Sequence, residues 1–97
     1  MPYVLRKFNE LRELTSQYSK IESLMNTMSK KLKYDISLLD DFRKIIAQRN
    51  NLILIIVKNT DEFNQMARGE NKVTYPFTSQ DIEIAKKSQK KQVRFLL

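Results

Sequence analysis

The sequence predicts an all-α protein in which two long antiparallel helices form a coiled-coil-like hairpin and a shorter helix follows. Three observations support this fold class. Large apolar residues recur at alternating three- and four-residue steps over residues 1–33, which keeps them on one side of a helix. Glycine occurs once and proline twice, which disfavours a turn-rich β-sandwich. A second apolar pattern of helical period begins beyond residue 37.

The first helix is expected over residues 3–31. Pro2 suits a helix start, because the first backbone N–H groups of a helix have no partner within it. A lone helix cannot bury such an apolar stripe, so the helix needs a partner in this chain or in another. Phe8 and Leu24 widen the stripe, which favours packing against more than one neighbour. The side chains expected to carry a protein interface are Leu11, Leu14, Tyr18, Ile21, Met25 and Met28.

A break is expected near residues 30–37, followed by a second helix over residues 37–67. Asp35 or Ser37 can cap this helix by accepting hydrogen bonds from its first N–H groups. Asp40 and Asp41 then fall in its first turn, where the helix dipole favours acidic side chains. The pattern therefore predicts a helical hairpin, with a kinked single helix as the alternative.

Residues 52–57 form the longest uninterrupted apolar run in the chain. Since every face of this stretch is apolar, we expect it to be buried on all sides. A two-helix hairpin cannot cover all of those faces, so the third helix or a second subunit must contribute. The run is rich in isoleucine and valine, so a buried strand is the alternative to a helix.

The third helix is expected over residues 79–93. Gly69 follows the last periodic residues of the second helix, as a C-cap glycine does. The loop after it, residues 69–77, ends where Thr78 or Ser79 precedes Asp81 in a pattern close to a capping box. The chain is thereby divided into a hairpin, residues 1–68, and a loop with a basic C-terminal helix and tail, residues 69–97.

The net charge of +7 is carried by the two ends of the chain. Residues 1–33 have a net charge of +4, residues 34–68 are neutral, and residues 69–97 have a net charge of +3. Such a distribution suggests an anionic partner, such as nucleic acid, an acidic protein face or a membrane surface. The alternative is a lysine-rich surface that is only solvated. The candidate contacts to nucleic acid, at helical spacing near the C-terminus, are Lys86, Lys87, Lys90, Lys91 and Arg94.

The last residues of the chain are apolar, and they follow this basic stretch directly. Phe95, Leu96 and Leu97 form a candidate docking tail. They resemble the short hydrophobic tails by which replication and transcription factors bind sliding clamps. The alternative is that they pack onto the hairpin and complete its core.

The residue types that most enzymes and metal sites use are missing from the sequence. There is no cysteine and no histidine, so disulfides, thiolate metal sites and the commonest general base are excluded. Adjacent acids such as Asp40 and Asp41 point to different helix faces, so no metal site and no cofactor are expected. No signal peptide is visible and the longest apolar run is too short to span a bilayer. We therefore expect a cytoplasmic or nuclear, non-enzymatic protein.

Arg49 interrupts the apolar pattern of the second helix. It is expected to pair with Asp41, with a carboxylate of a neighbouring helix or with a bound anion, and to set the register of a helical interface. The surrounding residues 45–52 are similar to the first-helix pattern of the small helical chorismate mutases. That resemblance implies Arg49 and Lys58 as carboxylate ligands in a small enzyme acting on an anionic metabolite. The same residues are also similar to a helix of a small ribosomal protein, so the pattern is typical of amphipathic helices and assigns the chain to neither family.

These observations favour a protein–protein interaction or assembly module that presents a helical face. Such a protein acts as an adaptor, a structural subunit or a small regulator, as a homo- or hetero-oligomer. The alternative is a nucleic-acid-associated factor in transcription or replication that uses the basic C-terminal helix. An enzyme that uses Arg49 and Lys58 is the remote alternative.

Overall fold

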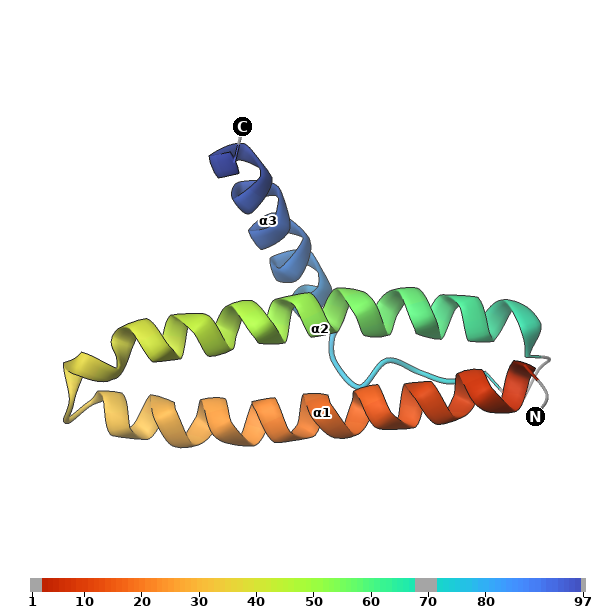
Figure 1. Ribbon diagram of the computed structural model, residues 1–97, viewed down its shortest axis with the longest axis horizontal. Helices are drawn as coiled ribbons and strands as arrows, with labels where there is room; N and C mark the ends of the chain where they lie inside the picture. Colours follow the sequence, from red (N-terminus) through yellow and green to blue (C-terminus); the bar gives the residue numbers. More distant parts are fainter. Residues whose placement is uncertain (1–2, 68–71, 97) are drawn as a thin grey trace.

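The computed structural model of the protein describes residues 3–67 and 72–96, with side chains as far as Lys90 in the last helix. Its elements are α1 (Tyr3–Leu32), the 3₁₀ helix η1 (Ile36–Leu38), α2 (Leu39–Met66) and α3 (Ser79–Leu96). Helices α1 and α2 lie side by side and run in opposite directions, while α3 starts near the middle of α2 and points away from the hairpin (Figure 1). The predicted all-α hairpin with a shorter C-terminal helix is confirmed, and the described residues contain no strand.

The turn between α1 and α2 is made without glycine. Asp35 accepts hydrogen bonds from the backbone N–H of Ser37 at 3.1 Å and from the Ser37 hydroxyl at 2.5 Å. The carbonyl of Lys31 accepts from the N–H groups of Tyr34 and Asp35 and so closes the end of α1. The predicted break is confirmed, although the chain re-enters helix through the 3₁₀ turn η1 and α2 begins only at Leu39.

The core joins all three helices in one cluster. Ile53 and Ile56 of α2 are fully buried in it. Side chains from α1 and α3 meet them there, and Phe77 of the connection packs against the cluster. The buried members of the cluster are Tyr18, Leu52, Ile53, Ile56, Ile82 and Ala85. Helix α3 is therefore held by the same apolar surface that holds the hairpin together.

Residues 52–57 are helical, which excludes the alternative of a buried strand. Within this chain, however, Ile55 is 47% exposed, so its expected burial stays a prediction that requires a second subunit. Leu54 and Val57 are half-buried. The reason is geometric: α1 and α3 pack on two sides of α2, and the remaining side of the helix faces solvent in the described chain.

An extended connection, residues 72–77, leads back along the hairpin to the start of α3. The side-chain amide of Asn64 donates to the carbonyl of Val73 and accepts from its N–H, both at 2.8 Å. The hydroxyl of Tyr75 donates to Asp61, and the ring of Phe77 meets that of Tyr18 edge-on with 5.3 Å between centroids. Helix α2 ends at Met66, and the predicted C-cap at Gly69 lies outside the described residues.

Candidate functional site

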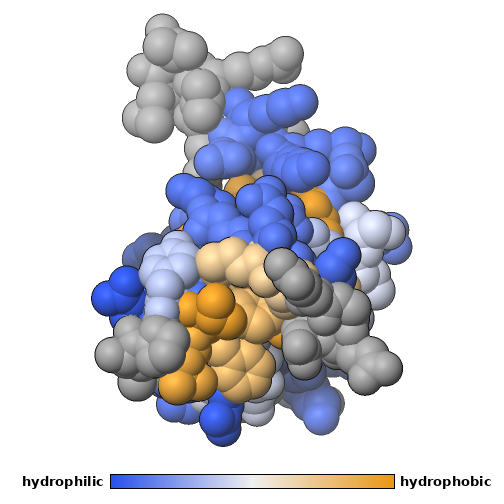
Figure 2. Space-filling view, turned by 90° about the vertical axis from the view of Figure 1, so that its right-hand side faces the viewer, coloured by the Kyte–Doolittle hydropathy of each residue, from blue (hydrophilic) through white to orange (hydrophobic). Residues whose placement is uncertain are grey.

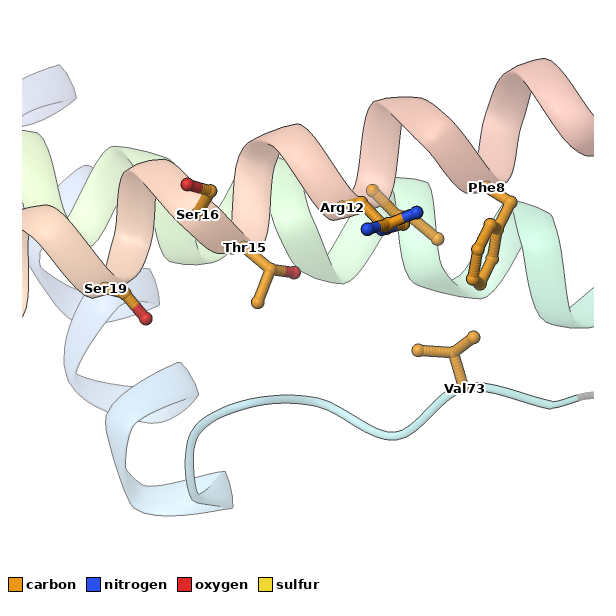
Figure 3. A pocket seen from close by; sticks show the side chains of 7 residues that line it. Phe8, Arg12, Thr15, Ser16, Ser19 and Val73 are labelled. Atoms are coloured by element: carbon orange, nitrogen blue, oxygen red, sulfur yellow. The ribbon is translucent and has the colours of Figure 1, made fainter.

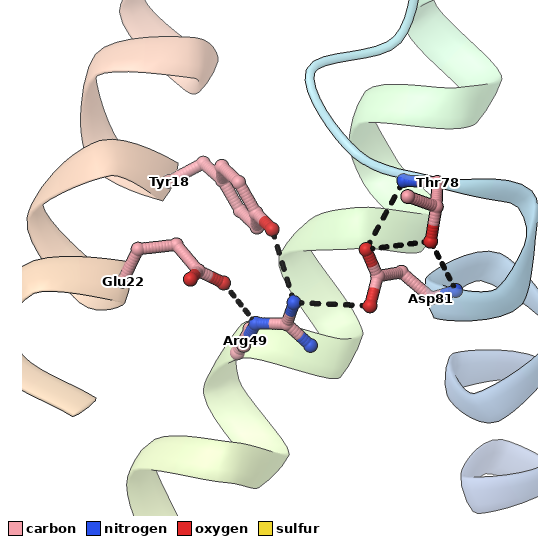
Figure 4. A network of polar contacts seen from close by, with 5 residues as sticks. All are labelled: Tyr18, Glu22, Arg49, Thr78 and Asp81. Atoms are coloured by element: carbon pink, nitrogen blue, oxygen red, sulfur yellow. Dashed lines mark hydrogen bonds and ion pairs between the residues drawn. The ribbon is translucent and has the colours of Figure 1, made fainter. Parts of the chain in front are cut away.

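Arg49 is the centre of a polar cluster that ties the three helices together (Figure 4). Its Nε donates to Glu22 of α1. Its Nη2 donates to the Tyr18 hydroxyl at 3.1 Å and to Asp81 Oδ1 of α3 at 3.3 Å. The Arg49 side chain is only 14% exposed, so these bonds form largely out of water, where charge-assisted hydrogen bonds are strong. The predicted pairing of Arg49 with a carboxylate on a neighbouring helix is confirmed, and the carboxylates come from this same chain.

Asp81 has two tasks in this cluster. Its Oδ2 accepts from the Thr78 N–H at 3.1 Å and from the Thr78 hydroxyl at 3.0 Å, while the Asp81 N–H donates back to Thr78 Oγ1. These reciprocal bonds are the predicted capping box at the start of α3. The bond from the Thr78 N–H is the main cause that lowers the pKa of Asp81 below its usual value, and the bond from Arg49 lowers it further.

Tyr18 lies between the polar cluster and the apolar core. The pKa of its phenol is raised to about 12, mainly by burial and also by the nearby Glu22 carboxylate, while Arg49 opposes the shift. The phenol therefore stays protonated at neutral pH, and its oxygen accepts a hydrogen bond from Arg49 while its ring packs against Phe77. The cluster consists of groups that satisfy one another, which is the arrangement of a structural support between helices.

Arg49 and Lys58 do not form a common anion site. They are nine residues apart on α2, which places them on opposite sides of the helix. Lys58 lines a shallow groove with residues of α2 and with Gln89 of α3, whereas Arg49 is committed to Glu22 and Asp81. The geometry implied by the resemblance to the chorismate mutases is therefore not found.

A groove between α1 and the connection combines apolar and polar groups (Figure 3). Its volume is about 320 Å³. Phe8 and Arg12 of α1 and Val73 of the connection surround it, and hydroxyl groups follow along the same helix face. The lining residues are Phe8, Leu11, Arg12, Thr15, Ser16, Ser19 and Val73. We call this hollow the α1 groove.

The α1 groove ends beside an apolar surface at the open end of the hairpin. Val4, Leu5 and Phe8, on the first turns of α1, are 44%, 48% and 38% exposed. We call these three residues the N-terminal apolar surface. Viewed along the hairpin from this end, apolar side chains gather near the centre, with hydrophilic ones above and below them (Figure 2). Sequence reasoning noted that Phe8 widens the stripe, but it did not place Val73 opposite α1.

The six predicted interface residues lie on the side of α1 that faces α2. Leu11 and Tyr18 are buried within the chain itself. Leu14 and Ile21 are half-buried and pack against the core cluster, and Met25 and Met28 are half-buried as well. The hairpin therefore covers much of the predicted stripe. Contact of these residues with another chain stays a prediction.

The predicted basic band is only partly within the described side chains. Lys86, Lys87 and Lys90 are exposed on α3, and none of them forms an ion pair with another described residue. The side chains of Lys91 and Arg94, and those of the candidate docking tail Phe95, Leu96 and Leu97, lie outside the described residues. The helical backbone of α3 continues to Leu96.

Neither a metal-binding cluster nor a membrane-spanning helix is found in the described part of the chain. No group of three or more acidic side chains converges as the ligands of a metal ion do. No helix there has both the length and the apolar character needed to cross a membrane.

The chain matches no known protein-family model, and no curated protein or solved structure is similar to it.

Proposed function

We propose that the protein is a non-enzymatic helical interaction module that binds a protein partner through the open end of its hairpin. The observation that carries this proposal is the N-terminal apolar surface. Val4, Leu5 and Phe8 keep between about a third and half of their side-chain area in contact with water. Adjacent exposed apolar side chains rimmed by polar ones are typical of protein interaction sites.

Val4 and Leu5 lie outside the core of the chain, whereas the ring of Phe8 packs on that of Phe63 with 5.9 Å between centroids. The core cluster is built from other residues of α1, α2 and α3, and it includes neither Val4 nor Leu5. Covering the exposed half of a valine, leucine or phenylalanine side chain is worth about 1 kcal/mol each. A partner that covers all three therefore gains several kcal/mol before the cost of association.

A photo-crosslinking amino acid at position 5 tests this proposal. It is introduced at Leu5, and at Asn26 as the control, in cells that express the protein naturally. Asn26 is exposed on the same helix, and 21 residues of helix place it about 30 Å away. We expect discrete protein adducts from position 5 and few from position 26. Equal adducts from both positions, or none from position 5, would contradict the proposal.

The partner in such an assembly is either a different protein or a second copy of the chain. Leu14, Ile21, Met25 and Met28 keep accessible edges beside the hairpin seam, and methionine adapts easily to different surfaces. Sedimentation equilibrium of the wild type and of Leu5→Glu distinguishes the two cases. A concentration-dependent dimer that Leu5→Glu abolishes identifies self-association, whereas a monomer at all concentrations identifies a different protein as the partner.

Association with nucleic acid is the second candidate function, and α3 favours it. Lys86, Lys87 and Lys90 are exposed and make no ion pair with another described residue. They lie on a helix that points away from the hairpin (Figure 1). Phosphate contacts by lysine depend strongly on salt and little on sequence.

A salt titration of duplex DNA binding tests this second function. Fluorescence anisotropy of a labelled duplex is measured between 50 and 300 mM NaCl for the wild type and for a variant with Lys86, Lys87, Lys90 and Lys91 changed to Gln. We expect the affinity of the wild type to fall steeply with salt and the slope to shrink by about 0.9 for each lost phosphate contact. Binding that is unaffected by the four substitutions would exclude α3 as the contact.

A further inference from the structure

The α1 groove combines an apolar base with one free cation. Phe8 and Leu11 of α1 and Val73 of the connection supply the apolar part, and the Arg12 side chain lies across it (Figure 3). Arg12 is exposed and forms no ion pair or hydrogen bond with any other residue that the structure describes. An arginine beside an apolar hollow offers a planar, bidentate donor to a carboxylate.

Two carboxylates of α2 already have partners. Glu62 pairs with Lys7 at 2.7 Å, and Asp61 accepts from the Tyr75 hydroxyl. The bond to Lys7 lowers the pKa of Glu62, so this carboxylate stays ionised and committed to its partner. Among the described residues that line the groove, Arg12 is the only charged one, so the charge that the lining carries is positive.

The groove also offers unused hydrogen-bonding groups. Thr15, Ser16 and Ser19 line it, and no hydrogen bond from their hydroxyls to another described residue is found. On the opposite wall, the backbone N–H and C=O of Val73 are already hydrogen-bonded to Asn64. The hydroxyl face of α1 is thus available to a ligand that lies between α1 and the connection.

We propose that the α1 groove binds an acidic segment of a partner protein, with an aliphatic side chain against Phe8, Leu11 and Val73 and a carboxylate paired with Arg12. This proposal rests on the proposed function and names the chemistry of the partner. The volume of about 320 Å³ lies at the small end of the range for ligand sites, which suits a few residues of an extended peptide. The N-terminal apolar surface continues from Phe8, so the same partner can cover both regions.

Selection from random twelve-residue peptides displayed on phage tests the proposal. The full-length protein is immobilised, and the enriched peptides are sequenced. We expect them to combine Asp or Glu with Leu, Ile or Val. The affinity of a synthetic peptide of the enriched sequence is then measured by fluorescence anisotropy for the wild type and for two charge-reversal variants.

The two variants form a matched pair on one helix. Arg12→Glu reverses the charge at the groove, and Arg6→Glu reverses an exposed arginine that does not line it. We expect Arg12→Glu to weaken binding at least tenfold and Arg6→Glu to change it less than twofold. Arg12→Glu is also expected to bind a peptide in which Lys replaces Asp and Glu more tightly than the wild type does. Circular dichroism confirms that both variants keep the helical content of the wild type.

Three outcomes would overturn the proposal. Acidic peptides are not enriched, or Arg12→Glu binds the enriched peptide as tightly as the wild type does, or Arg12→Glu and Arg6→Glu lose the same amount of affinity for it. None of them affects the crosslinking expected from position 5, which reports on the N-terminal apolar surface with any partner. Adducts at position 5 without an acidic peptide signal therefore refute the groove ligand and leave the proposed function standing. If neither the adducts at position 5 nor the enrichment of acidic peptides is found, the proposed function is refuted as well.

Discussion

Arg49 and Asp81 form an ion pair between α2 and α3, with 3.3 Å between the Nη2 and Oδ1 atoms. The other oxygen of the same carboxylate caps α3 through Thr78. The Asp81 side chain therefore contributes both to the start of α3 and to its contact with α2. Since the same guanidinium also holds Glu22, the position of α3 depends on the packing of α1 against α2.

Arg49→Met is predicted to lower the free energy of unfolding by about 2 kcal/mol, because it leaves two partly buried carboxylates without their cation. Glu22 and Asp81 keep 30% and 26% of their side-chain area exposed, so water offsets part of the loss. Urea denaturation followed by circular dichroism measures the change. Arg43→Met, an exposed change on the same helix, is the control and is expected to cost less than about 0.5 kcal/mol. Equal effects of the two changes would show that the cluster adds no stability.

Acidification is predicted to destabilise the protein through Asp81. Its pKa in the folded state lies below the ordinary value of 3.8, so its contribution is complete above that value and is lost as the pH falls through the lowered one. Thermal unfolding between pH 2 and pH 7 is expected to show a decline of the midpoint that starts near pH 4. Asp81→Asn keeps an acceptor for Thr78 without the charge, so its midpoint is expected to depend less on pH in this range. Identical pH profiles would refute the role of Asp81.

Ile56→Ala is predicted to lower the free energy of unfolding much more than Ile55→Ala does, although both changes remove the same atoms from adjacent residues. Ile56 is fully buried, so its truncation leaves a cavity and costs about 3 kcal/mol. Ile55 is 47% exposed, so its truncation is expected to cost less than about 1 kcal/mol. Denaturant unfolding of both variants measures the difference. Comparable losses would mean that Ile55 is covered in solution, for instance by a second copy of the chain.

Asn50→Leu is predicted to stabilise the fold by about 1 kcal/mol. Asn50 is 6% exposed, and its side-chain oxygen has no hydrogen-bond partner among the described residues. A buried acceptor without a donor costs free energy, whereas an apolar side chain of similar size does not. A higher midpoint in thermal unfolding supports this account. A lower midpoint would show that the oxygen binds a partner such as a trapped water molecule.

Much of the fold follows from apolar periodicity alone, because helix pairing requires only that each stripe find a partner. The helix limits were predicted to within a few residues, and the capping box at Thr78 and Asp81 was predicted from its spacing. The direction of α3 relative to the hairpin could not be predicted from apolar periodicity. Its course depends on which side of α2 the residues Ile82 and Ala85 bury, and a short helix with few apolar residues fits several positions.

The candidate sites were less accessible from the sequence than the fold. Arg49 was expected to meet a carboxylate, but no local pattern separates Glu22 from the other acids of α1, and Asp81 lies 32 residues away. The α1 groove depends on Val73, which lies in a loop without periodicity. Val73 is bound to Asn64 of α2 through its backbone N–H and C=O, so the identity of its side chain does not predict this contact.

The two hydrogen bonds between Asn64 and Val73 fix one end of the connection, so the length of chain from there to α3 is set. From that anchored point, five residues of chain lead to Thr78, and they are tied down again where Tyr75 meets Asp61. One residue inserted between Val73 and Tyr75 would shift Asp81 away from Arg49, or it would break the contact of Val73 with Asn64 or that of Tyr75 with Asp61. The spacing of this stretch, more than the identity of its residues, therefore sets where the third helix docks.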